Sequence, residues 1–163
     1  MMLEKLPNRV LFACTLNSAR SPMAEGIMKK LYGDQMFVDS VGARKGEIAS
    51  FSIAAMAEIG IDISSHKAKT FEELDSKPFD VVISLSPEAQ HKAVELTRSS
   101  DCHLLFWHTF DATSVSGNRD TILSAFCEVR DFLLHQILFK FAPTIPPRIP
   151  NHPIWKAIIS KKS

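Results

Sequence analysis

Residues 10–22 read VLFACTLNSARSP, and this stretch joins an apolar run to the start of a helix. The first four residues predict a short buried strand, while Ser21 followed by Pro22 is typical of a helix N-cap and first helical position. Cys14 and Arg20 lie in the loop between them. Loop amides, a helix N-terminus and a planar guanidinium together favour a bound oxyanion, and the same positive field stabilises a cysteine thiolate.

The rest of the chain alternates short apolar runs with segments of helical periodicity. This alternation predicts a single three-layer α/β domain, in which helices cover both faces of a central four-stranded parallel sheet and crossovers are right-handed. Further strands are expected at residues 37–40, 79–85 and 102–107, and helices at 52–59, 70–74, 89–98 and 120–141. Thr70 and Glu73 have the spacing of a capping box, and Ser86 before Pro87 repeats the cap-then-Pro helix start. The last helix is expected to carry one apolar stripe: Ile122, Phe126, Val129, Leu133, Ile137 and Phe141. Since parallel strands end at one rim, Asp111, just past the fourth strand, should lie near Cys14.

Length and composition predict one domain rather than two, because the chain has 163 residues of which 45% are hydrophobic. We place that domain at residues 1–141. Five prolines, at 143, 146, 147, 150 and 153, set apart a Pro-rich tail of residues 142–163. We expect this tail to pack on its own domain or to be disordered, rather than to bind a partner or a membrane.

Charge and cysteine usage narrow the function classes. A formal net charge of +1 with scattered lysines and arginines argues against nucleic acid as a partner. No uncharged apolar run approaches the ~18–20 residues that span a bilayer, and we expect residues 10–16 to be a strand rather than a signal peptide. Three cysteines without a CxxC pair indicate a reducing compartment, hence the cytoplasm, with Cys102 and Cys127 expected to be buried and inert.

Several motifs in order along the chain resemble one family. The opening V-L-F-A-C-T-x-N-S-x-R-S-P-M-A-E of residues 10–25 is similar to that of the low-molecular-weight protein tyrosine phosphatases and the related thioredoxin-type arsenate reductases. D-S-x-G at 39–42, G-I-D-I-S-x-H-x-A-K at 60–69, F-D-V-V-I at 79–83 and Asp111 before the last helix follow in the same order. The resemblance covers residues 9–141 and leaves the tail outside it.

The resemblance implies a role for each matching residue. Cys14 is the expected nucleophile, forming a phosphocysteine intermediate. Arg20 binds the phosphoryl oxygens, and Asp111 acts first as general acid and then as general base. The phosphate-binding loop comprises Thr15, Leu16, Asn17, Ser18, Ala19, Arg20 and Ser21, with the Ser21 hydroxyl donating to the thiolate. Asn17, Ser40 and His66 are expected to support the loop through hydrogen bonds.

The resemblance implies a phosphatase that hydrolyses a phosphomonoester, such as phosphotyrosine, in a small molecule or a phosphoprotein. It also implies that inorganic phosphate or sulfate occupies the loop. No cofactor or metal is expected, since the histidines share no metal-ligand spacing. Two alternatives stay open: a thiol-coupled arsenate reductase, and an oxyanion-binding regulator with little turnover.

Some positions depart from the family pattern and bear on these alternatives. Leu16 stands where the family has Gly, so the loop is expected either to be reshaped or to be unstrained there. Ala112 replaces Pro beside the acid, which should loosen that loop by about 0.4–1 kcal/mol. Thr113 stands where an aromatic residue often flanks the pocket, and Ala19 replaces a second loop cysteine. Residues 84–90 lack the cysteine pair of thioredoxin-coupled reductases.

Overall fold

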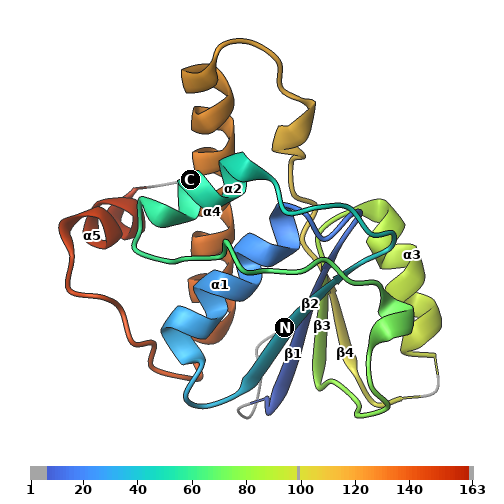
Figure 1. The fold of residues 1–163 in the computed structure, drawn as a ribbon. Coiled ribbons are helices and arrows are strands. Elements are labelled where there is room, and N and C mark those ends of the chain that lie inside the picture. Colours follow the sequence, from blue (N-terminus) through green and yellow to red (C-terminus); the bar gives the residue numbers. More distant parts are fainter. Residues whose placement is uncertain (1–6, 99, 162–163) are drawn as a thin grey trace.

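A computed structural model describes residues 7–98 and 100–161. Its centre is a parallel four-stranded sheet in the order β2-β1-β3-β4 (Figure 1). The strands are β1 (Arg9–Cys14), β2 (Phe37–Gly42), β3 (Val81–Ser84) and β4 (His103–Phe106). The predicted fold class is therefore confirmed.

The strand register places the loop that follows β1 at the centre of one rim of the sheet. β1 lies between β2 and β3, with Cys14 opposite Gly42 and Ala13 opposite Ser84. Because all pairings are parallel, the four carboxyl ends share this rim. The chain segments after β1, β2, β3 and β4 therefore meet there.

Helices cover both faces of the sheet. α1 (Arg20–Tyr32), α2 (Ser50–Ala57), α4 (Arg119–Phe141) and α5 (Pro153–Ser160) lie on one side, and α3 (Pro87–Leu96) on the other (Figure 1). The short 3₁₀ helix η1 (Phe71–Glu73) packs on the α3 side. A buried stripe on α4 faces the larger core, as the helical period predicted: Phe126, Val129, Leu133, Ile137 and Phe141.

Most predicted helix starts are confirmed. The Ser86 side chain caps α3 by accepting from the Ala89 amide, and the expected capping box opens η1. α1 is the exception, because it begins at Arg20 after Ala19 and has no side-chain cap. Predicting Ser21 as its N-cap was wrong, because the Ser21 hydroxyl lies against the Cys14 thiol instead. The loop between β1 and α1 thus uses the group that would otherwise cap the helix.

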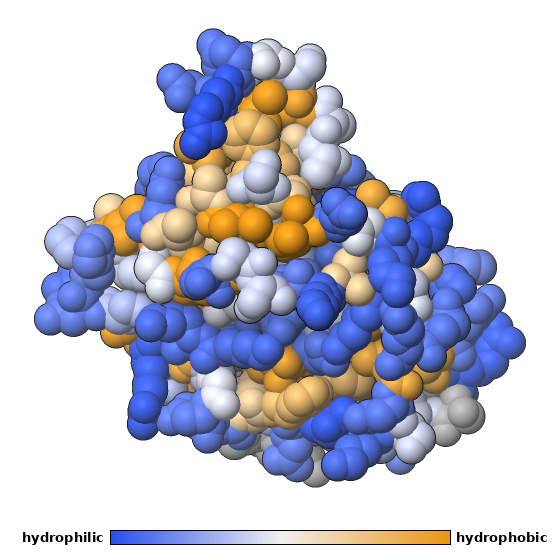
Figure 2. Space-filling view, in the orientation of Figure 1, coloured by the Kyte–Doolittle hydropathy of each residue, from blue (hydrophilic) through white to orange (hydrophobic). Residues whose placement is uncertain are grey.

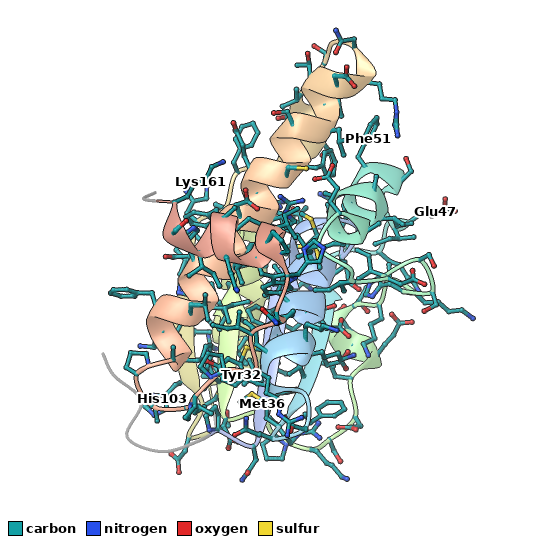
Figure 3. The ribbon with its side chains drawn as sticks, turned by 90° about the vertical axis from the view of Figure 1, so that its left-hand side faces the viewer. Tyr32, Met36, Glu47, Phe51, His103 and Lys161 are labelled. Carbon is teal, nitrogen blue, oxygen red and sulfur yellow. The ribbon has the colours of Figure 1, made fainter. Side chains whose placement is uncertain are left out.

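The tail carries a helix and packs on the domain. Trp155 of α5 is buried, and its indole Nε1 donates to the Ile59 carbonyl oxygen at 2.9 Å. The Tyr32 hydroxyl, near the carboxyl end of α1 (Figure 3), donates to the Ile145 carbonyl oxygen at 3.1 Å. These contacts fasten residues 142–160 over the α1 side of the sheet. The division into residues 1–141 and 142–163 stays a prediction.

None of the helices within residues 7–98 and 100–161 combines the length and the apolar character needed to cross a membrane.

Candidate active site

The loop between β1 and α1 holds the cysteine at the helix N-terminus. Cys14 is 2% exposed. Its Sγ lies 2.9 Å from the Ser21 Oγ and 3.4 Å from the Ser21 backbone nitrogen, which donates to it. A hydroxyl, a backbone N–H and the positive end of a helix therefore converge on the sulfur. All three stabilise negative charge there.

Arg20 is buried and anchored on two sides. One terminal nitrogen, Nη1, donates to the Thr109 carbonyl oxygen at 3.1 Å, and the other, Nη2, donates to the Thr15 hydroxyl at 3.2 Å. The same Nη2 lies 3.9 Å from Oδ2 of Asp111. These contacts fix the guanidinium plane at the loop, and a fixed plane suits paired contacts with an oxyanion.

Asp111 lies at the mouth of the same site, as predicted. Its Oδ1 accepts from the Thr113 backbone nitrogen at 3.0 Å and from the Thr113 hydroxyl at 2.6 Å. This cap opens the 3₁₀ helix η2 (Ala112–Ser114). Oδ2 is thereby left facing Arg20, and the side chain is 46% exposed. The carboxyl group is held by one oxygen and offers the other to a reacting group.

A small pocket of about 40 Å³ joins these groups. Since one water occupies ~10–15 Å³ of such a pocket, the pocket suits an oxyanion of a few heavy atoms. Its lining includes the apolar side chain of Leu16 and the polar side chain of Thr113. The lining residues are Cys14, Thr15, Leu16, Ser18, Ala19, Arg20, Asp111 and Thr113.

Asn17 organises the back of the loop. It is fully buried, and at φ 53° it is the one non-glycine residue with positive φ in the part of the chain that the structure describes. Leu16 is therefore unstrained, and the positive φ falls on a residue type that tolerates it. Asn17 Nδ2 donates to the hydroxyls of Ser21 at 2.8 Å and Ser40 at 3.0 Å.

The side-chain oxygen of Asn17 also has two hydrogen-bond partners. Its Oδ1 accepts from the Lys69 backbone nitrogen at 3.0 Å and lies 3.0 Å from His66 Nε2. The structure thus brings together Asn17, Ser40 and His66, the residues expected to support the loop. Burial lowers the pKa of His66, and the nearby Glu25 carboxylate opposes this in part.

Sequence reasoning missed two members of this arrangement, Glu25 and Gly42. Glu25 accepts a hydrogen bond from the Ser40 hydroxyl. Gly42 lies against the loop backbone, where a Cβ would be 2.7 Å from the Asn17 nitrogen and 2.8 Å from the Leu16 carbonyl carbon. Both residues belong to motifs already noted, but only the pairing of β1 with β2 shows what they touch.

The other two thiols lie outside the loop pocket. Cys102 precedes β4, at the opposite rim of the sheet, and Cys127 lies on α4 with its sulfur 3.4 Å from Glu58 Oε1. Both are half-buried, so the expectation that they would be buried was wrong. Burial raises the pKa of each thiol to about 11, which leaves them as poor nucleophiles. Within residues 7–98 and 100–161, no group of three or more histidine, cysteine or carboxylate side chains could hold a metal ion.

Comparison with known proteins gives one family match and several relatives. The model of the family described as low molecular weight phosphotyrosine protein phosphatase matches residues 9–122, a range that includes Cys14 and Asp111. The arsenate reductase of Halalkalibacterium halodurans is 34% identical over 122 residues, covering 75% of this chain and 86% of that protein. The glutaredoxin arsenate reductase of Synechocystis sp. is 42% identical over 77 residues, 47% of this chain, which spans 59% of that protein's length.

The similar solved structures include an arsenate reductase and a tyrosine phosphatase. An arsenate reductase in the phosphate binding state superposes with a TM-score of 0.63 at 31% identity, over 80% of this chain and 93% of that one. The tyrosine phosphatase AmsI of Erwinia amylovora superposes with a TM-score of 0.66, over 82% of this chain and 91% of that one. Its identity of 17% shows likeness of fold alone.

Proposed function

We propose that this chain, which belongs to the low-molecular-weight phosphotyrosine protein phosphatase family, hydrolyses a phosphomonoester through a phosphocysteine intermediate. One observation carries the proposal: the sulfur of Cys14, the guanidinium of Arg20 and the carboxyl group of Asp111 line a single pocket. Attack, charge stabilisation and proton transfer are the three requirements of phosphoryl transfer by a cysteine.

In the first step, the Cys14 thiolate attacks phosphorus, so an S–P bond forms as the P–O bond to the leaving group breaks. The leaving oxygen takes a proton from Asp111. Arg20 and the loop amides hold the equatorial oxygens, on which charge is spread in the transition state. The Ser21 hydroxyl, 2.9 Å from the sulfur, stabilises the thiolate before attack and after its release.

In the second step, water attacks phosphorus and the S–P bond breaks. Asp111, now a carboxylate, takes the proton from that water, and Cys14 leaves as a thiolate. The products are inorganic phosphate and the restored enzyme. One carboxyl group serves both steps because it returns to its starting protonation state after each cycle. Each cycle consumes one phosphomonoester and one water, and releases one alcohol and one inorganic phosphate without a cofactor.

Arsenate reduction is the second candidate, favoured by the name of the Halalkalibacterium halodurans relative, of whose length this chain covers 86%. Cys14 would attack arsenate and displace water to form an S–As bond. Attack on that sulfur by a second thiol would release arsenite, reducing arsenic by two electrons and leaving a disulfide. A third thiol would then attack this disulfide and release Cys14 as a thiolate. Because Cys102 and Cys127 lie outside the pocket, the second and third thiols would come from an external carrier such as glutathione or thioredoxin.

The proposal also covers the substrate and the cellular compartment. Phosphotyrosine, free or in a phosphoprotein, is the substrate to test first, and phosphate or sulfate is the expected loop ligand. We assign the protein to the cytoplasm, because a thiolate nucleophile needs a reducing compartment. The third hypothesis is an oxyanion-binding regulator with little turnover. The experiment below distinguishes it from the phosphatase and the arsenate reductase.

The test measures aryl phosphate hydrolysis and arsenate reduction, the latter with glutathione or thioredoxin, on the same preparations. Cys14→Ser should abolish both activities. Asp111→Asn should lower hydrolysis ~10²–10⁴-fold and remove the acid dependence of its pH profile. Cys102→Ser is the matched control and should keep wild-type rates. A wild-type protein that binds phosphate but turns over neither substrate would refute both enzymatic readings and support the regulator.

A further inference from the structure

A cavity much larger than the catalytic pocket lies along the outside of α1. Its volume is about 670 Å³, within the ~300–1,000 Å³ typical of small-molecule sites. Segment 60–69, green in Figure 1, crosses over α1 to form its outer edge. We name it the lysine groove; its lining is Pro22, Glu25, Gly26, Lys29, Lys30, Asp39, residues 60–63 and 65–67, and Lys69.

Charge in the lysine groove is unevenly neutralised. Lys29 pairs with Glu25, and Lys69 Nζ lies 2.6 Å from Asp39 Oδ2. Lys30 and Lys67, by contrast, have no ion pair within residues 7–98 and 100–161, although both face the groove. Asp62 also lines the groove without an ion pair in those residues, and its Oδ1 accepts from the Ser64 backbone nitrogen. Four lysines against three carboxylates leave the lining with one positive charge in excess. The middle of this face is largely hydrophilic (Figure 2).

The groove also has an apolar floor. Ile61 and Ile63 line it, and with Gly26 they form one contiguous wall, since a Cβ on Gly26 would lie 3.1 Å from Ile63 Cγ2 and 3.3 Å from Ile61 Cγ2. Two unpaired cations beside an apolar wall suit a ligand with an apolar body and a negative group.

His66 connects this groove to the catalytic loop. Asn17 Oδ1 must be an acceptor, because the Lys69 backbone N–H donates to it. His66 Nε2, 3.0 Å from the same oxygen, therefore carries the ring proton and donates it. Nδ1 is then an acceptor, and the nearest carboxylate, Glu25, lies 3.9 Å away and cannot donate to it. His66, which holds the loop through Asn17, is thus also a lining residue of the groove.

We propose that the lysine groove is an effector site for a small organic anion. Its negative group would pair with Lys30 and Lys67, and its apolar body would pack on Ile61 and Ile63. Occupancy changes the surroundings of His66, and so the hydrogen bond that holds Asn17 at positive φ. Binding of the organic anion to the lysine groove does not depend on the proposed function. The coupling between the groove and the loop rests on the proposed function, because it requires the oxyanion site.

The binding test uses naphthalene-1-sulfonate, an aromatic anion that a phosphatase cannot hydrolyse. It is titrated into ¹⁵N-labelled protein containing saturating inorganic phosphate, so that the catalytic loop is blocked. Amide signals of Lys30, Ile61 and Lys67 should shift on binding. Signals that move in residues 14–20 alone would show competition at the loop and overturn the proposal, as would no shift at all.

Matched charge variants test which lysines are responsible. The double variant Lys30→Ala, Lys67→Ala should weaken sulfonate binding at least ~fivefold. The control, Lys45→Ala with Lys92→Ala, also removes two positive charges, but its lysines pair with carboxylates of η1. It should bind as wild type does. Equal weakening of sulfonate binding in both double variants would show that net charge alone causes the effect, and would refute the proposed site.

Coupling is measured as the affinity for inorganic phosphate, by calorimetry, with and without saturating sulfonate. We expect a change of ~fivefold or more in wild type, within the usual range for linked sites. Unchanged affinity alongside clear groove shifts would refute the coupling while keeping the site. Absence of turnover would refute the proposed function. The sulfonate titration and the phosphate affinity would still test the groove, because neither measurement uses hydrolysis.

Discussion

Replacing Asn17 with alanine tests whether one buried amide fixes the geometry of the loop between β1 and α1, the proposed catalytic loop. The change removes hydrogen bonds to Ser21, Ser40, His66 and the Lys69 backbone nitrogen. At ~0.5–1.5 kcal/mol for each of these bonds, their loss lowers the free energy of unfolding by about 2–6 kcal/mol. Alanine at positive φ adds ~1 kcal/mol, since it lacks the local hydrogen bonds that let asparagine adopt this conformation.

The assay is equilibrium unfolding in urea, followed by thermal unfolding. A combined loss of about 3–7 kcal/mol corresponds to a fall in Tm of roughly 6–28 °C for a domain of this size. Asn118→Ala is the matched control, because Asn118 makes a single capping bond to the Thr121 amide and should lose only ~1 kcal/mol.

Phosphate distinguishes loss of the loop from general loss of stability. Saturating phosphate should raise the Tm of wild type and of Asn118→Ala, because a ligand stabilises the folded state that it binds. It should leave the Tm of Asn17→Ala unchanged. If Asn17→Ala lost no more stability than the control, or kept the full phosphate-induced shift, the reasoning on this network would be wrong.

Three further predictions use the same stability assay. Gly42→Ala should destabilise the protein by ~1–3 kcal/mol and weaken phosphate binding, because the new Cβ would meet the Asn17 nitrogen at 2.7 Å; unchanged phosphate affinity would contradict this. Trp155→Ala should lose ~3–5 kcal/mol because the side chain is 1% exposed, whereas Phe139→Ala, at 83% exposed, should lose little; equal losses would show that the tail is not fastened as described. Burial lowers the pKa of His66 from 6.5, so the unfolded chain takes up the proton first and wild-type stability should fall as pH drops below about 6.5. His66→Gln should show a shallower fall, and an identical pH slope would refute it.

Much of the site was predictable because its signals are local. The apolar run before Cys14, the spacing to Arg20 and the helix that follows are all set by neighbouring residues. Alternation of strands and helices then places Asp111 on the same rim, since parallel strands must end together. The capping patterns at Ser86 and at Thr70 were likewise read correctly, because a cap involves residues within one turn.

Tertiary structure decided what those signals left open. Whether Ser21 caps a helix or contacts a thiol depends on where Asn17 and Cys14 lie around it, and hydroxyls suit both roles. The close approach of Gly42 to the loop exists only because β2 pairs with β1.

The sequence by itself determined the order of elements, the loop and the chemistry of its side chains. The structure decided that Asn17, not Leu16, takes the positive φ, and that Lys69 and His66 hold it there from some fifty residues away. Periodicity and capping are written into adjacent residues. A buried hydrogen bond between distant segments depends on packing of the whole chain, which no local pattern contains.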